Sequence, residues 1–169
     1  GQWVLFNGTN GEGKSTIIET AAGLIPLEAG SVLHHGKLLI DKAGRSNKPS
    51  HPFGLTLQAD GCIGSQRIEE HLLTSMDFTG SRIDMDSILE RYNLKHRKHD
   101  CIAQLSGGQR RKVAMIAGLL PGFISLDPLL IFLDEPDSGL DQASRTNLIE
   151  DIQYLRQKGH AILIASHNT

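Results

Sequence analysis

Residues 8–15 carry the most specific chemistry in the sequence. They are Gly-Thr-Asn-Gly-Glu-Gly-Lys-Ser and match the spacing G-x-x-x-x-G-K-[ST]. Glycines let main-chain N–H groups turn inward around a polyphosphate, because no Cβ stands in the way. The lysine then reaches the β- and γ-phosphates, and the serine hydroxyl ligates Mg²⁺. The expected nucleotide-binding residues are Gly8, Thr9, Asn10, Gly11, Glu12, Gly13, Lys14, Ser15 and Thr16.

Two carboxylates follow a later apolar run. Residues 129–133 are Leu-Leu-Ile-Phe-Leu, and Asp134 and Glu135 come directly after them. Ligands of parallel α/β sheets bind at the carboxyl ends of the strands. In phosphate-loop enzymes an aspartate at that place holds Mg²⁺, directly or through water. A glutamate beside it can polarise the attacking water as a general base.

A second anion-binding pattern lies at residues 105–109, Leu-Ser-Gly-Gly-Gln. A serine and two glycines at a helix start offer exposed N–H groups, a hydroxyl and a favourable dipole. The chain therefore has two phosphate-binding helix starts but a single lysine-bearing loop. This arrangement fits a symmetric head-to-tail pair. In such a pair, residues 8–15 of one copy hold a nucleotide that the other copy covers with Ser106, Gly107, Gly108 and Gln109.

Short apolar runs and helical patterns alternate along the chain and are expected to position these residues. Strand candidates are residues 3–6, 53–57, 129–133 and 161–165. Helical patterns cover residues 14–24, 66–94, 106–120 and 146–158. Strands alternating with helices predict a parallel α/β sheet, and residues 31–33 and 37–40 predict a hairpin.

Local signals sharpen the helix that begins with the second anion-binding pattern. Ser106 is expected to cap it, and Pro121 with Gly122 is expected to stop it. The clean apolar stripe of this helix assigns the basic triplet Arg110-Arg111-Lys112 to the solvated side.

Composition limits the function classes. The 169 residues suit one domain, and a net charge of −2 gives no global sign of a nucleic-acid partner, so no direct nucleic-acid contact is predicted. The longest apolar run, residues 129–133, is too short to span a bilayer. Cys62 and Cys101 form neither a disulfide framework nor a zinc motif, which favours reduced thiols and a cytoplasmic protein.

The ordered motifs resemble the ATP-binding cassette of ABC-type ATPases over nearly the whole chain. In order they are Walker A (residues 8–15), the Gln58 loop, the signature (105–109), Walker B (129–135), the D-loop (138–141) and the switch His167. The resemblance implies a P-loop NTPase core of the α/β class. That core has a mostly parallel sheet, a small antiparallel β portion and an inserted helical subdomain at about residues 59–104. We expect residues 1–169 to form a single domain that is a piece of a longer protein.

The resemblance also implies roles for single residues. Lys14, Glu135 and His167 are the expected catalytic residues, with His167 contacting the γ-phosphate. Ser15, Gln58 and Asp134 are the expected Mg²⁺ ligands, and Gln58 couples the site to the helical subdomain. Asp141 is expected to cross a dimer interface. Asp137 departs from the family, which more often has a small hydroxyl residue there. The aromatic residue on which the family stacks adenine lies upstream of the Walker A strand and is absent here, so the choice of ATP over GTP rests on the resemblance alone.

The leading functional expectation is a subunit that binds and hydrolyses MgATP for an ABC transporter. Its partners would be a second ABC ATPase domain, in a homo- or heterodimer, and an integral membrane subunit at the cytoplasmic face. One alternative is a non-transport ABC-type ATPase in DNA repair, chromosome organisation or translation. The chromosome type is disfavoured, because residues 17–104 show no sustained heptads. Another alternative, a non-catalytic nucleotide-binding module, is disfavoured by Lys14, Glu135 and His167.

Overall fold

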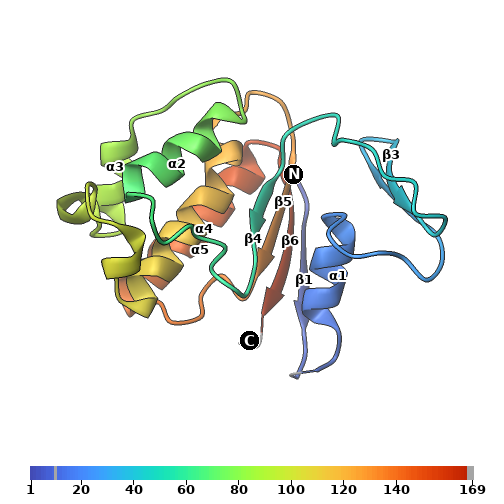
Figure 1. Cartoon of the computed structure of the whole chain (residues 1–169), viewed down its shortest axis with the longest axis horizontal. Coiled ribbons are helices and arrows are strands. Elements are labelled where there is room, and N and C mark those ends of the chain that lie inside the picture. The colour runs from blue at the N-terminus through green and yellow to red at the C-terminus, as the bar shows by residue number, and fades with distance from the viewer. Residues whose placement is uncertain (10, 167–169) are drawn as a thin grey trace.

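Four parallel strands form the central sheet, in the order β1–β6–β5–β4 (Figure 1). The computed structural model describes residues 1–9 and 11–166. The strands are β1 (Trp3–Asn7), β4 (Gly54–Thr56), β5 (Leu130–Asp134) and β6 (Ala161–Ser166). A separate antiparallel pair, β2 (Ser31–His34) and β3 (Lys37–Asp41), lies beyond the first helix. The expected α/β class, with a mostly parallel sheet and a small antiparallel portion, is confirmed.

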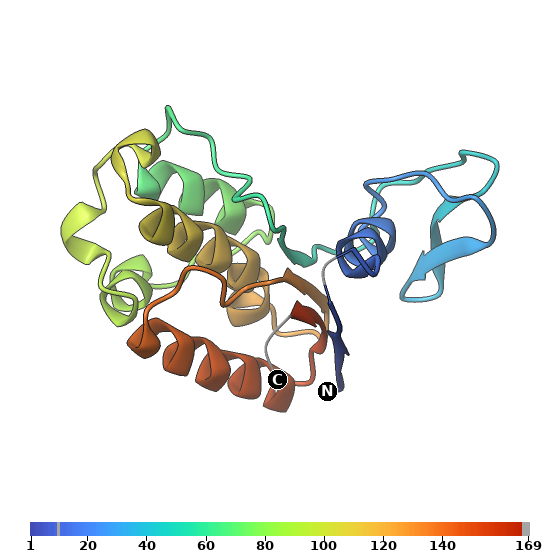
Figure 2. The ribbon, with the colours of Figure 1, turned by 90° about the horizontal axis from the view of Figure 1, so that it is seen from below.

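Helices cover both faces of this sheet. They are α1 (Lys14–Ala21), α2 (Ile68–Asp77), α3 (Met85–Arg91), α4 (Gly107–Ile124) and α5 (Gln142–Gln157), with short 3₁₀ turns at Lys95–Arg97 and Ile102–Gln104. Figure 2 shows α1 on one side of the sheet and α4 and α5 on the other, with α2 outside α4. Among the residues that the structure describes, no helix combines the length and the apolar character that a membrane span requires.

The middle strand β5 shows why its sequence is apolar without a break. Ile131 and Leu133 belong to the large core under α4 and α5. Phe132 points to the opposite face and packs with Ile18 of α1. Side chains alternate along a strand, so a strand covered on both faces has to be apolar at every position.

Helix α4 extends past the point where proline and glycine were expected to stop it. The expected end at Leu120 is wrong, because Pro121 and Gly122 lie inside the helix, which ends at Ile124. The terminal carbonyls accept hydrogen bonds from elsewhere in the fold: Lys158 Nζ donates to Phe123 O at 2.9 Å. His160 Nε2 lies 2.8 Å from Gly122 O. Tertiary contacts thus outweigh the proline, which costs one intrahelical N–H bond.

Two other helix boundaries also differ from expectation. The pattern over residues 66–94 forms two helices rather than one, because α2 ends at Asp77 and α3 begins at Met85. Asp84 caps α3 by accepting from Asp86 N at 3.1 Å. Helix α5 starts at Gln142 rather than at residue 146, because Asp141 caps it by accepting from Ser144 N at 2.8 Å. Short polar side chains at both helix starts satisfy N–H groups that have no intrahelical partner.

Candidate functional site

The carboxyl ends of the four parallel strands meet at one edge of the sheet. Asn7, just before the phosphate loop, pairs in register with Ser166. Asp134 pairs with Ala165, and Thr56, two residues before Gln58, pairs with Leu133. Adjacent strand ends therefore hold the phosphate loop, the Walker B carboxylates and Gln58 together. Asn10 and His167 lie outside the described residues, although His167 directly follows β6.

The phosphate loop is closed around its own lysine. Lys14 Nζ donates to Gly8 O at 2.6 Å and to Thr9 O at 2.7 Å. Gly11 and Gly13 have φ values of 86° and 83°, a left-handed conformation that glycine adopts without strain. Gly13 precedes α1, so the open N-terminus of that helix faces the loop. Ser15 is half-buried in the first turn of α1, whereas Thr16 is exposed.

A carboxylate also folds back onto this loop. Glu12 Oε2 accepts from Thr9 N at 2.9 Å, and Glu12 Oε1 accepts from the Thr9 hydroxyl at 2.8 Å. A Cβ placed on Gly8 would lie 2.0 Å from Glu12 Oε2, so the carboxylate rests directly against that glycine. The loop expected to hold an anion therefore carries a negative charge of its own.

Asp134 and Glu135 occupy the end of β5 in different ways. Asp134 is almost fully buried, and its Oδ1 has no hydrogen-bond partner among the described residues. Glu135 is half-buried, and Gln58 Nε2 donates to its Oε2 at 3.4 Å. The main chain of Glu135 is left-handed, with φ at 45°, and its N–H donates to Ala165 O at 2.8 Å. A positive φ strains the main chain of a non-glycine residue, and such strain is typical of functional sites.

Arg111 is the residue of this site that the sequence argument missed. The triplet was assigned to the solvated side, but that assignment is wrong for Arg111 and Lys112, which are 4% and 8% exposed. The Arg111 guanidinium donates to the carbonyls of Leu57 at 2.5 Å and Asp134 at 2.6 Å. Burial lowers the pKa of this guanidinium, and nearby carboxylates, led by that of Asp60, oppose the shift. Helical periodicity contained no signal for this, because α4 is covered by α2 on one side and by the sheet on the other.

The signature residues begin α4. Ser106 Oγ accepts from Gln109 N at 3.3 Å, and Gln109 Oε1 accepts from Ser106 N at 3.0 Å, which is a complete capping box. A Cβ on Gly108 would lie 3.0 Å from Gly139 O, so the signature and the D-loop are neighbours. The start of α4 and the loop between β1 and α1 lie well apart in both views (Figures 1 and 2). The structure thus does not bring Ser106, Gly107, Gly108 and Gln109 to the phosphate loop of the same chain.

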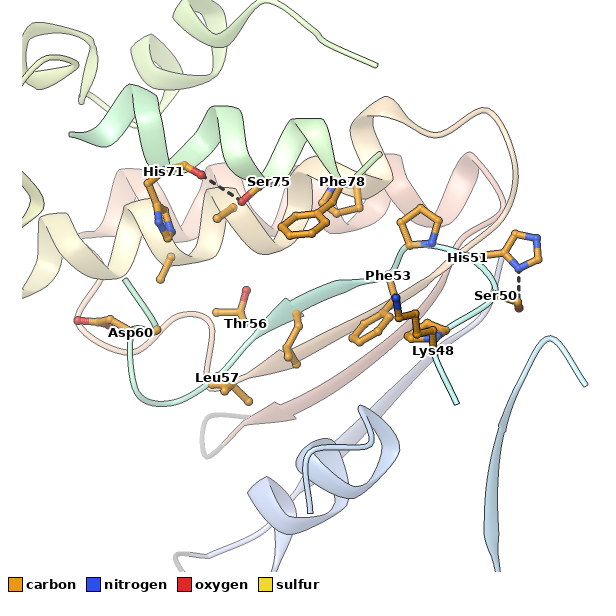
Figure 3. A pocket seen from close by; sticks show the side chains of 17 residues that line it. Lys48, Ser50, His51, Phe53, Thr56, Leu57, Asp60, His71, Ser75 and Phe78 are labelled. Carbon is orange, nitrogen blue, oxygen red and sulfur yellow. Dashed lines mark hydrogen bonds between the residues drawn. The ribbon is translucent and has the colours of Figure 1, made fainter. Parts of the chain in front are cut away.

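A large cavity lies beside the segment that contains Gln58, and Leu57, Asp60 and Gly61 of that segment line it (Figure 3). Its volume is about 840 Å³, and its lining comes from β4, α2, α4 and residues 48–53. Figure 3 shows His71 and Ser75 of α2, and Phe78 just after it, facing Thr56 and Phe53 across the cavity, with Asp60 at one end. The sequence held no signal for this cavity, because its walls come from segments far apart in the chain.

Comparisons with known proteins agree with this arrangement. A family model described as "ABC transporter" matches residues 1–138. The lipoprotein-releasing system ATP-binding protein LolD of Ehrlichia chaffeensis is 30% identical over 99% of this chain and 73% of its own. The glutamate/aspartate import ATP-binding protein GltL of Escherichia coli is 29% identical over 99% and 70%. ATP-binding cassette sub-family A member 2 of Rattus norvegicus is 30% identical, but this chain spans only 7% of its length.

A solved structure, an ATP-binding subunit of an ABC transporter, superposes with a TM-score of 0.78. It is 25% identical and covers 98% of this chain, which in turn covers 68% of it. The family model covers well over half of the sequence, and the fold and the order of the motifs agree with it. The chain therefore belongs to the ABC transporter family, whose members hydrolyse ATP, and it contains the ATP-binding domain of that family.

Proposed function

We propose that this chain binds MgATP and hydrolyses it. The observation that carries the proposal is that the ends of β1 and β5 meet at one sheet edge, on either side of β6. These ends bring together the Lys14 loop, Glu135, and Asp134, whose buried Oδ1 has no partner in the part of the chain that the structure describes. Phosphoryl transfer needs mainly positioning and charge stabilisation, and these groups supply both.

The residues at this edge suit a Mg²⁺ ion. Among the described residues, Asp134 Oδ1 is a buried carboxylate oxygen with no hydrogen-bond partner, an arrangement that is costly unless a cation or water satisfies it. Ser15 and Gln58 would complete an all-oxygen ligand set with it, the type that Mg²⁺ prefers. When bound, the ion would neutralise charge on the β- and γ-phosphate oxygens.

The side chains then divide the chemistry. Two of the three N–H groups of the Lys14 ammonium donate to the loop carbonyls and hold it in the loop, and the third can donate to the β- or γ-phosphate. Glu135 accepts the proton of the attacking water, and Gln58 holds that carboxylate by donating to it. His167, which directly follows β6, is proposed to contact the γ-phosphate.

A head-to-tail dimer explains the second anion-binding helix start. The capping box leaves Ser106 and the N-terminus of α4 at the surface, where the hydroxyl and N–H groups can face a phosphate of another copy. Figures 1 and 2 place the chain's own phosphate loop elsewhere. We propose that each nucleotide is enclosed by residues 8–15 of one domain and residues 106–109 of a second ABC ATPase domain.

The names of two relatives support a proposal about the biological setting. GltL is named as an import ATP-binding protein and LolD as part of a lipoprotein-releasing system. We propose that this domain likewise powers an integral membrane transporter subunit, as a peripheral component at the cytoplasmic face. The full-length protein should then copurify with one integral membrane protein at fixed stoichiometry, and a transported compound should raise the ATPase rate. An ATPase rate that no membrane partner changes would contradict this setting.

The catalytic part is tested with Glu135→Gln in the full-length protein. The variant should bind ATP with a Kd within about twofold of the wild-type value and lose about 100-fold or more of its turnover, because an amide cannot accept the proton. ATP binding is measured by isothermal titration and turnover by phosphate release. Unchanged turnover in this variant would remove Glu135 from the base role.

The dimer is tested in the same Glu135→Gln background. Saturating ATP should convert the full-length protein from monomer to dimer in light scattering. Adding Ser106→Asp should abolish the conversion, because aspartate retains the helix cap but places a negative charge against the phosphates. A protein that stays monomeric at saturating ATP would refute the sandwich while leaving MgATP binding intact.

A further inference from the structure

One buried guanidinium joins the two segments that carry the proposed reactive groups. Arg111 Nη1 donates to Leu57 O at 2.5 Å and lies 3.4 Å from Gln58 O. Its Nη2 donates to Asp134 O at 2.6 Å and to Glu135 O at 2.5 Å. Leu57 is 54 residues and Asp134 23 residues from Arg111 in the sequence, so only the fold brings them together.

The hydrogen bonds from Arg111 lie just beyond the end of the pairing between β4 and β5. The β4–β5 ladder ends at Thr56 and Leu133. Beyond these residues β4 and β5 no longer pair with each other, although Asp134 still pairs with Ala165 of β6. The carbonyls of Leu57 and Asp134 accept from Arg111. The planar fork of arginine can serve two diverging main chains at once, whereas an ammonium is a single point of charge.

These carbonyls and nearby carboxylates, led by that of Asp60, surround the buried cation. Arg111 is 4% exposed, and Asp60 Oδ1 lies 4.0 Å from its Nη1. Arg111 Nε has no hydrogen-bond partner among the described residues. A buried charge with one unsatisfied donor contributes little to the stability of the fold, because its desolvation is costly. Its four main-chain contacts hold the backbone of the proposed base in a defined place.

We propose that Arg111 is a positioning residue that locks the main chains of Gln58 and Glu135 into one unit. This inference rests on the proposed ATPase function and adds a residue to it. Glu135 is held at a φ of 45°, and Arg111 is one of the groups that keep it there. The Gln58 segment cannot shift relative to the base without breaking a charge-assisted hydrogen bond. Asp60, which lines the cavity behind this segment, lies beside the same guanidinium.

The first experiment needs no hydrolysis. Hydrogen exchange is measured on wild type, Arg111→Met and Arg111→Lys of the full-length protein without nucleotide. In Arg111→Met, the amides of Glu135 and Ser138 and those of β4 should exchange together, about tenfold faster or more. Arg111→Lys should show an intermediate effect, which keeps the test valid if Arg111→Met does not fold. The matched control is Arg110→Met, because Arg110 lies one residue away and donates to Leu105 O at 2.7 Å. Unchanged exchange, or a change in only one of the two segments, would overturn the proposal.

The second experiment separates positioning from general stability. Arg111→Met should lower kcat about tenfold or more and change the KM for ATP by no more than about twofold. Added to Glu135→Gln, it should cause no further loss, because it acts through the same carboxylate. A full additional loss in the double variant would assign Arg111 a separate, structural role. A wild-type protein without ATPase activity would refute the proposed function, while the exchange result would still decide whether Arg111 joins the two segments.

Discussion

The ammonium of Lys112 lies 2.6 Å from the carboxylate of Asp141, which is 29 residues later in the chain. Lys112 also donates to Tyr92 O at 3.3 Å, just after α3. One buried ammonium therefore joins the signature helix α4, the end of α3 and the cap of α5. Asp141, expected to act across a dimer interface, is already bound within its own chain.

Asp141→Asn tests how much this ion pair contributes to the free energy of unfolding. Asparagine keeps an oxygen that can accept from Ser144 N, so the cap of α5 survives. Its amide nitrogen then replaces Oδ2, so the ionic attraction and the hydrogen bond from Lys112 are both lost. Because the Asp141 side chain is 57% exposed, we expect a loss of about 1 kcal/mol or less at pH 7. Urea unfolding monitored by circular dichroism measures the difference.

The same variant should show a defined pH dependence. The hydrogen bond from Lys112 holds the pKa of Asp141 well below its ordinary value of 3.8. A lowered pKa in the folded state contributes stability that is present above the unfolded value and is lost as the pH falls below it. The difference in unfolding free energy between wild type and Asp141→Asn should therefore stay constant from pH 7 to 5 and shrink below pH 3.8. A gap that is as large at pH 3 as at pH 7 would contradict this account.

Glu135→Gly should stabilise the protein while removing its activity. Glycine adopts the φ of 45° at position 135 without the steric cost of a Cβ. The expected gain in unfolding free energy is about 1 kcal/mol, partly offset by the larger entropy of glycine in the unfolded chain. Glu135→Ala is the control, because it also removes the carboxylate but keeps the Cβ. If both variants had the same midpoint in urea, strain at this residue would be excluded.

Gly118→Ala should destabilise the contact between α4 and the sheet. Alanine favours a helix by about 1 kcal/mol relative to glycine. At this position, however, its Cβ would lie 2.1 Å from Thr56 Oγ1 and 2.8 Å from Leu55 O. We expect a net loss of about 1–3 kcal/mol from overpacking, measured by urea unfolding. Gly107→Ala, on the open first turn of α4, should be neutral or stabilising. Equal effects of the two substitutions would mean that α4 shifts freely on β4.

Glu12→Ala should tighten nucleotide binding. The Glu12 carboxylate accepts from the N–H and the hydroxyl of Thr9 inside the loop that we propose to bind the phosphates. The carboxylate repels the negatively charged phosphates. Removing it near the surface should improve the binding free energy of ATP by about 1 kcal/mol, which corresponds to a roughly fivefold lower Kd. The gain should shrink at high salt. Glu12→Gln keeps the shape and removes the charge, so it should give most of the same gain; weaker binding in both variants would show that Glu12 supports the loop.

Local sequence determined the elements and the order of the motifs. The apolar run before Asp134, the glycines and Lys14 of the phosphate loop, and the Ser106 cap each follow from the conformational preferences of a few adjacent residues. The pairing of parallel strands then brings residues that follow different strands to one edge. For these reasons the α/β class and the meeting of Gly8, Asp134 and Gln58 could be predicted without coordinates.

Tertiary structure alone decided what depends on distant partners. Pro121 stays helical because Lys158 and His160 bond the carbonyls at the end of α4. Arg111 is buried because α4 lies between the sheet and α2, and Arg111 donates to carbonyls at the ends of β4 and β5. Periodicity reports the preference of one segment, whereas a buried cation needs carbonyls supplied by two others. The sequence by itself thus determined where the proposed phosphate and metal ligands lie along the chain, and only the fold showed what holds those segments in place.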